Sequence, residues 1–118
     1  MTLKEIAPII NLDLERVVAL FMGKEEMYIK FLKKFPDNAA KLLTDLHEAV
    51  KNNDHEKIEA AAHGMKGVAG NLGVQEVINY GTALMLDIRN NTPENIPEHY
   101  QKVVAETEKA ITYIEKLD

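Results

Sequence analysis

The sequence contains no cysteine, has fewer basic than acidic residues, and has no long apolar run. The absence of cysteine excludes disulfide bonds, thiolate metal sites and a cysteine nucleophile. Lysine and arginine number 14 against 19 aspartates and glutamates, so the formal net charge is -5. An acidic chain has no electrostatic reason to bind nucleic acid or an anionic membrane surface. No segment approaches the ~20 apolar residues that cross a bilayer, so no membrane insertion is predicted.

The composition is that of a folded protein: of 118 residues, 46% are hydrophobic and 28% are charged. This length suits one domain, and we predict a single helical domain over residues 1–118. The apolar run at residues 6–10 is too short for the hydrophobic core of a signal peptide. With no cysteine and no export signal, a cytoplasmic protein is expected.

Apolar residues recur at steps of three and four along most of the chain, whereas the alternation typical of strands is nearly absent. The longest such segment, residues 24–52, keeps one apolar phase on both sides of Pro36. We predict one helix kinked at Pro36, with a break there as the alternative. Further helices are expected at about 14–21, 55–71, 74–91 and 95–117. Short connections favour antiparallel neighbours, so the predicted fold is all-α: an up-down-up-down four-helix bundle with a short extra N-terminal helix.

Four of the six glycines fall within residues 64–73, inside a predicted helix. A glycine in a helix interior costs about 1 kcal/mol relative to alanine, so their presence needs a reason. At 100° per residue, His63 lies on the side opposite the core residue Met65, and Lys66, Gly67 and Gly70 share its face. The spacing therefore predicts an exposed histidine beside a backbone left bare for the approach of a large partner.

An exposed neutral imidazole is a nucleophile near pH 7. The ammonium group of Lys66, one turn along the same face, would stabilise negative charge on a phosphoryl group transferred to or from His63. The sequence has no Walker-type loop and no kinase-type nucleotide motif. The phosphoryl group would therefore have to come from another protein.

These residues resemble the signature of histidine phosphotransfer (Hpt) domains, in which a histidine, a hydrophobic residue, lysine and glycine are followed by small residues and a closing Leu-Gly. The matching segment reads His63-Gly64-Met65-Lys66-Gly67-Val68-Ala69-Gly70-Asn71-Leu72-Gly73. The preceding Ala61-Ala62 fits the same pattern, as do residues 22–28 and 31–35. The resemblance covers roughly residues 12–117, nearly the whole chain.

The resemblance implies a role for each residue of the motif. His63 would be phosphorylated, and Lys66 would stabilise the charge of the phosphoryl group. The glycines at 64, 67 and 70 would belong to the docking surface. Gly67 would leave space for the phosphoryl group and the receiver, and Gly70 would keep side chains from projecting into the approach surface. The chain would relay phosphoryl groups between receiver-domain aspartates, or from a histidine kinase or hybrid kinase pathway to a response regulator. It would be a monomeric phosphocarrier rather than an enzyme, with no cofactor of its own, and the Mg²⁺ for transfer would belong to the receiver.

Two positions depart from the family pattern. Gly64 stands where threonine or another side chain is common, which should loosen the helix beside His63. Many members hold the imidazole with a glutamine or glutamate from the neighbouring helix. Here the facing stretch, residues 82–86, offers only Thr82 as a polar side chain.

Several residues have a second interpretation. Met27 and Phe31 form an i, i+4 pair that would either contact the short N-terminal helix or belong to an apolar receiver-docking patch, and both could hold. Close helix packing explains Gly81, which lies on an apolar face, but not Gly67 or Gly70. The remaining histidines lack metal-ligand spacing and are interpreted as solvated surface residues: His47, His55 and His99.

Three other functions compete with phosphotransfer. One is a helical bundle that binds a metal or cofactor, but the sequence lacks the repeated inward glutamates and histidines that such sites require. Residues 64–67 match the GxxG of RNA-binding KH domains, but that fold needs strands and RNA needs positive charge. A bundle of the same shape could also serve as an adaptor that binds a receiver or kinase without carrying phosphate. In an adaptor His63 would be dispensable, whereas Met27 or Phe31 would not.

Overall fold

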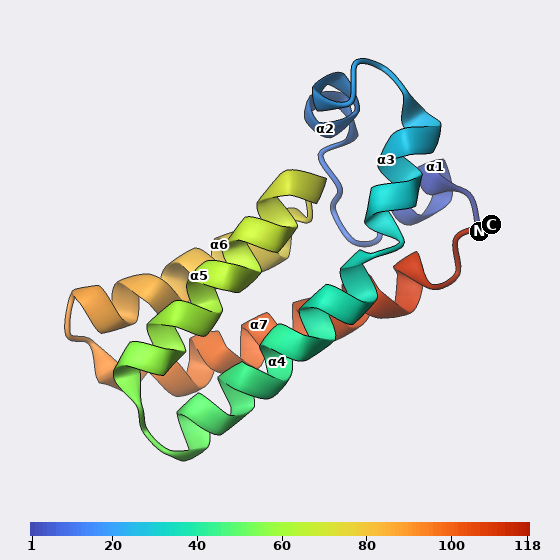
Figure 1. Ribbon diagram of the computed structural model, residues 1–118. Helices are drawn as coiled ribbons and strands as arrows, with labels where there is room; N and C mark the ends of the chain where they lie inside the picture. The colour runs from blue at the N-terminus through green and yellow to red at the C-terminus, as the bar shows by residue number, and fades with distance from the viewer.

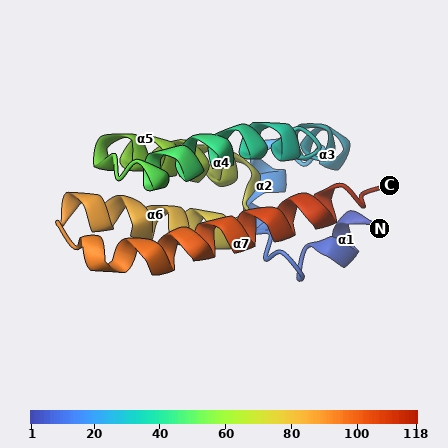
Figure 2. The same cartoon turned by 90° about the horizontal axis from the view of Figure 1, so that it is seen from below.

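A computed structural model describes residues 1–118 as an all-helical chain. Its main body consists of four helices, α4 (Phe35–Lys51), α5 (His55–Leu72), α6 (Gln75–Arg89) and α7 (Ile96–Ile114). A 3₁₀ turn at Pro93–Asn95 precedes α7. Neighbouring helices run antiparallel, and α4 packs on both α5 and α7, which closes the bundle (Figure 1). Figure 2 shows two layers, α4 with α5 and α6 with α7. The predicted fold class is confirmed.

One hydrophobic core joins all of these helices, and each contributes an apolar stripe at helical spacing. Among the fully buried side chains are Leu46 of α4, Met65 of α5, Leu84 of α6 and Ile114 of α7. The interior is therefore built by the periodicity that the sequence displays. No helix combines the length and the apolar character that a membrane crossing requires.

The predicted helix over residues 24–52 is wrong in one respect, because the structure divides it in two. Helix α3 covers Glu25–Leu32, and α4 begins at Phe35 after a tight turn in which the Lys34 amide donates to the Phe31 carbonyl. Pro36 lies in the first turn of α4, where its missing N–H costs no hydrogen bond. The helix is interrupted just before Pro36, so the structure agrees with the predicted break near the proline and not with one kinked helix.

The N-terminal part contains two short helices, α1 (Leu3–Ile6) and α2 (Leu14–Leu20), where one was predicted. With α3 they lie at one end of the bundle (Figure 1). The backbone of residues 11–13 pairs with the turn between α5 and α6: Asp13 N–H donates to the Gly73 carbonyl at 3.0 Å, and a single bridge joins Leu12 to Val74. The chain forms no β-strand, so the KH alternative is wrong.

Candidate functional site

Helix α5 begins with a side-chain cap and ends with a glycine. At the N-terminus of α5, the Asp54 side chain accepts a hydrogen bond from the Lys57 amide. At the C-terminus of the helix, Gly73 adopts the left-handed conformation, with a φ of 75°. A Cβ atom at Gly73 would lie 2.7 Å from Val17 Cγ1. The closing glycine therefore both ends the helix and admits α2 against it.

His63 lies near the middle of α5, on its outward face. Its side chain is exposed, whereas Ala62 and Met65 are buried on the opposite side. The side-chain hydrogen bonds made by histidines belong to the other three, so both ring nitrogens of His63 are free of protein partners. The helical phase thus presents an unoccupied imidazole to an approaching molecule.

The three glycines next to His63 fall into two environments. A Cβ atom at Gly67 or Gly70 would meet no heavy atom within 4 Å, so both leave open space on the outward face. A Cβ atom at Gly64 would lie 2.9 Å from Leu42 Cδ2. Gly64 therefore faces α4 and allows Leu42 to pack against the α5 backbone.

Lys66 is half-buried beside the contact between α5 and α6 and takes part in none of the ion pairs of the chain. A Cβ atom at Gly81 of α6 would lie 3.4 Å from the Ala62 carbonyl oxygen and 3.7 Å from the Lys66 amide nitrogen. Close packing at Gly81 thus brings α6 against the backbone that carries Lys66. The ammonium group remains available to an anion placed near His63.

The helix facing His63 supplies no hydrogen bond to its ring. The Thr82 hydroxyl donates to the Ile78 carbonyl of its own helix at 2.7 Å. One turn before His63, the Glu59 carboxylate accepts a hydrogen bond from Arg89 Nε of α6 at 2.8 Å. This pair ties α5 to α6 beside the site. Sequence reasoning did not single it out, although Glu59 lies four residues before His63.

Two contacts from the N-terminal helices hold the C-terminal end of α5, and sequence reasoning missed both. Arg16 of α2 donates from Nη2 to the Gly70 carbonyl at 3.3 Å and from Nε to Asp13 at 3.0 Å. The buried Tyr28 hydroxyl of α3 donates to the Leu72 carbonyl at 2.6 Å. Both acceptors belong to the last turn of α5, whose carbonyls have no partner within the helix.

Met27 and Phe31 lie on α3, with 43% and 44% of their surface exposed. The Phe31 ring lies 5.4 Å from that of Phe21, the C-cap residue of α2, so the predicted contact with the short helix is present. Two more exposed apolar side chains lie on α2 and on the connection between α2 and α3. They are Leu20, 63% exposed, and Met22, 85% exposed, neither of which was predicted. We call Leu20, Met22, Met27 and Phe31 the hairpin patch.

The interpretation of His99 as a solvated residue is wrong. Its Nδ1 atom lies 2.6 Å from Oδ2 of Asp87, whose side chain is buried. Asp87 and His99 sit on α6 and α7, and the Thr92 hydroxyl donates to the other carboxylate oxygen at 3.4 Å. The helical periodicity of a sequence shows on which face of its own helix a residue lies. It does not show which residue of another helix that face meets, so the contact between Asp87 and His99 could not be predicted.

Comparison with known proteins places this arrangement in a family. The Hpt domain model matches residues 30–115, and the chain therefore belongs to the Hpt-domain family. This is the family of histidine phosphotransfer domains, which act as phosphocarriers in two-component phosphorelays with receivers and kinases as partners.

Two curated proteins are similar to part of the chain. The chain is 35% identical over 72 residues, or 61% of its length, to the sensory/regulatory protein RpfC of Xanthomonas campestris pv. campestris, in strains ATCC 33913 and 8004. The matched segment makes up 10% of those proteins, so the chain spans about a tenth of the length of these relatives. No solved structure matches the chain.

Proposed function

We propose that this chain carries a phosphoryl group on His63 and relays it between receiver-domain aspartates, or from a kinase pathway to a response regulator. The observation that carries the proposal is the outward face of α5: an exposed imidazole with no protein partner, a free lysine one turn away, and open space over Gly67 and Gly70. Membership of the Hpt family supports the same chemistry.

The transfer step needs few groups from this chain. A ring nitrogen of His63 attacks the phosphorus of an aspartyl phosphate with its lone pair, and an N–P bond forms. The P–O bond to the carboxyl group breaks, and its electron pair remains on the carboxylate of the receiver. The Lys66 ammonium stabilises the charge on the phosphoryl oxygens during transfer. Return to a second receiver is the reverse of this step.

The remaining parts of the reaction belong to the partner. The chain acts as a phosphocarrier without an ATP site, and the Mg²⁺ that the transfer uses is held by the receiver domain. We infer that residues 1–118 work as one monomeric cytoplasmic domain. The outward face of α5 and the exposed Met27 and Phe31 would form the receiver-docking surface, because α3, α4 and α5 lie in one layer of the molecule (Figure 2).

A transfer assay tests the proposal. A receiver domain phosphorylated on its aspartate is mixed with the chain, and acid-labile, base-stable label is expected on the chain but not on the His63→Gln variant. His55→Gln is the matched control, because His55 belongs to the same helix and bonds only to Asn53. Label that persists on His63→Gln would refute the assignment of the phosphorylated residue.

The competing function is an adaptor that binds a receiver or kinase without carrying phosphate. The exposed hairpin patch favours it, since apolar docking needs no phosphoryl group. In that case His63→Gln would leave the biological output intact, whereas Phe31→Ala would abolish binding. A phosphocarrier would lose its output with either change.

A further inference from the structure

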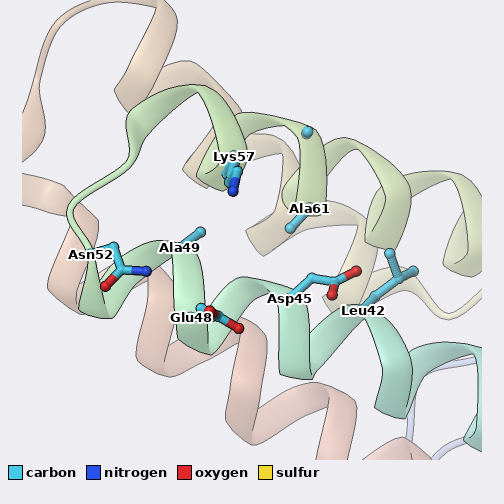
Figure 3. Close-up of a pocket in the computed structure, with 8 residues that line it drawn as sticks. Leu42, Asp45, Glu48, Ala49, Asn52, Lys57 and Ala61 are labelled. Atoms are coloured by element: carbon cyan, nitrogen blue, oxygen red, sulfur yellow. The ribbon is translucent and has the colours of Figure 1, made fainter.

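A groove separates α4 from the N-terminal half of α5 and has a volume of about 410 Å³. Its floor is apolar and is formed by the small side chains of Ala49 and Ala61, both buried. Leu42 and Asp45 rise from α4 toward α5 along one wall, and Glu48 stands on the same helix (Figure 3). The groove is open because alanines, rather than larger residues, face each other at this helix contact.

One end of the groove adjoins the proposed phosphorylation site. Ala60 lines the groove and precedes His63 by three residues, which is about 4.5 Å along the helix axis. Leu42 lines the groove as well and packs against Gly64, the residue after His63. The groove and the imidazole therefore share one edge of α5.

A receiver that docks over His63 will cover this groove. A specific interface of standard size buries roughly 800 Å² on each partner, which corresponds to a disc with a radius of roughly 16 Å. The groove residues from 42 to 52, on α4 and at its C-cap, span about 15 Å along the helix axis. A contact of that size centred on His63 includes them.

The covered wall is negatively charged and has no partner in the chain. Asp45 and Glu48 are exposed, one turn apart, and neither takes part in an ion pair or a side-chain hydrogen bond. Lys57, also in the lining, stands on α5, across the groove from α4 (Figure 3). The lining thus holds two carboxylates against one ammonium group, a net negative charge. Covering that net charge without a positive group from the partner is unfavourable, and like charge from the partner would be repelled.

We propose that the α4–α5 groove is a specificity site for the receiver, and that its occupant is an arginine or lysine side chain at the rim of the receiver's docking face. The aliphatic part of that side chain lies over the alanines, and its charged end lies beside Asp45 and Glu48. The docking face then carries positive charge at Lys66, beside the phosphoryl group, and negative charge in the groove. A partner with the complementary arrangement of charges can bind in only one orientation. This inference rests on the proposed relay function.

The experiment compares two double variants that each remove two negative charges. Asp45→Asn/Glu48→Gln removes both carboxylates of the groove. As the control, Glu108→Gln/Glu115→Gln removes two exposed carboxylates, one on α7 and one at its C-cap. The probe is the receiver domain from the same genome that binds the unaltered chain most tightly. Its equilibrium Kd, the KM for transfer and the dependence of both on salt are measured. Circular dichroism checks that both variants fold.

We expect the groove variant to raise Kd and KM about fivefold and to weaken their salt dependence, with kcat and the control variant unchanged. Labelling by phosphoramidate, a small phosphodonor that needs no docking surface, should not change. A groove variant that binds the receiver as well as the unaltered chain would overturn the inference, and so would equal losses in both variants. The Kd measurement needs no phosphoryl transfer. Failure of His63 to take up label would therefore refute the relay function, whereas the Kd values would still test the groove.

Discussion

The hydroxyl group of Tyr28 on α3 donates a hydrogen bond to the Leu72 carbonyl at the end of α5, and the two oxygens lie 2.6 Å apart. Both residues are buried, although 44 positions separate them in the sequence. The bond satisfies a carbonyl that α5 itself cannot pair. It joins the N-terminal helices to the helix that carries His63, and so positions the hairpin patch relative to the site.

Loss of this bond should be measurable as a loss of stability. Tyr28→Phe keeps the ring and leaves the Leu72 carbonyl buried without its partner, so we expect the free energy of unfolding to fall by about 1–2 kcal/mol in urea titrations. Tyr80→Phe is the control, because the Tyr80 hydroxyl makes no hydrogen bond within the chain. Equal losses of unfolding free energy in the two variants would show that the hydrogen bond from Tyr28 to Leu72 does not stabilise the fold.

The same residue predicts sensitivity to high pH. Burial raises the pKa of the Tyr28 hydroxyl above its ordinary value of 10.0. Below pH 10 the hydroxyl is neutral in both states, and its contribution to stability is complete. Above pH 10 the unfolded chain releases this proton while the folded chain retains it, so the free energy of unfolding falls. In Tyr28→Phe this alkaline decline should be shallower, and an unchanged slope between pH 9 and pH 11 would contradict the assignment.

Substitution by alanine should change the free energy of unfolding in opposite directions at Gly67 of α5 and at Gly73, the C-cap of that helix. Gly67 has open space around it, so Gly67→Ala should stabilise the helix by about 0.5–1 kcal/mol while its methyl group slows phosphotransfer from a receiver. Gly73 has a φ of 75° and touches Val17, so Gly73→Ala should destabilise the chain by about 1 kcal/mol or more. Urea titration and a transfer assay check both variants. A destabilised Gly67→Ala would mean that this face is not open.

Removal of the Lys66 charge should slow the chemistry and leave the fold intact. Lys66 makes no ion pair, so Lys66→Ala leaves no carboxylate without its counterion, and the free energy of unfolding should barely change. Transfer to His63 should slow by about tenfold or more, because the ammonium no longer offsets phosphoryl charge. Lys66→Arg, which keeps the charge, should recover most of the rate. An unchanged rate in Lys66→Ala would remove its electrostatic role.

The contact between Asp87 and His99 should stabilise the α6–α7 end of the bundle. His99→Ala leaves the buried Asp87 carboxylate without its neighbour on α7, and we expect a loss of about 1–3 kcal/mol in the free energy of unfolding. His47→Ala is a fair comparison, since His47 is exposed and contacts Tyr100 across α4 and α7. A smaller loss in His99→Ala than in His47→Ala would argue against a structural role for the buried pair.

One buried hydroxyl group should be dispensable. Thr107 of α7 has no exposed surface, and its Oγ1 atom has no hydrogen-bond partner. Thr107→Val preserves the shape of the side chain and removes the unpaired polar atom, so we expect a gain of about 1 kcal/mol. Thr112→Val, at an exposed position where the hydroxyl donates to the Glu108 carbonyl, should show no such gain. A loss of stability in Thr107→Val would indicate that the hydroxyl is satisfied.

The four main helices and the exposure of His63 could be predicted because both follow from a local rule. A helix advances by 100° per residue whatever surrounds it, so the phase of Met65 places His63, Gly67 and Gly70 on the opposite side. Pro36 shows where this reasoning fails. The apolar phase continues across the proline, and phase alone cannot distinguish a kink from two helices that bury the same face.

The sequence by itself determined the helical periods, the amphipathic faces and the residue types at the site. The tertiary structure alone decided that Gly64 faces Leu42, that Tyr28 reaches Leu72, that Asp87 meets His99, and that Asp45 and Glu48 border an open groove. The physical reason is that each of these contacts joins two helices. Their formation depends on how closely and at what height the helices pack, and these quantities come from the fit of whole side-chain surfaces.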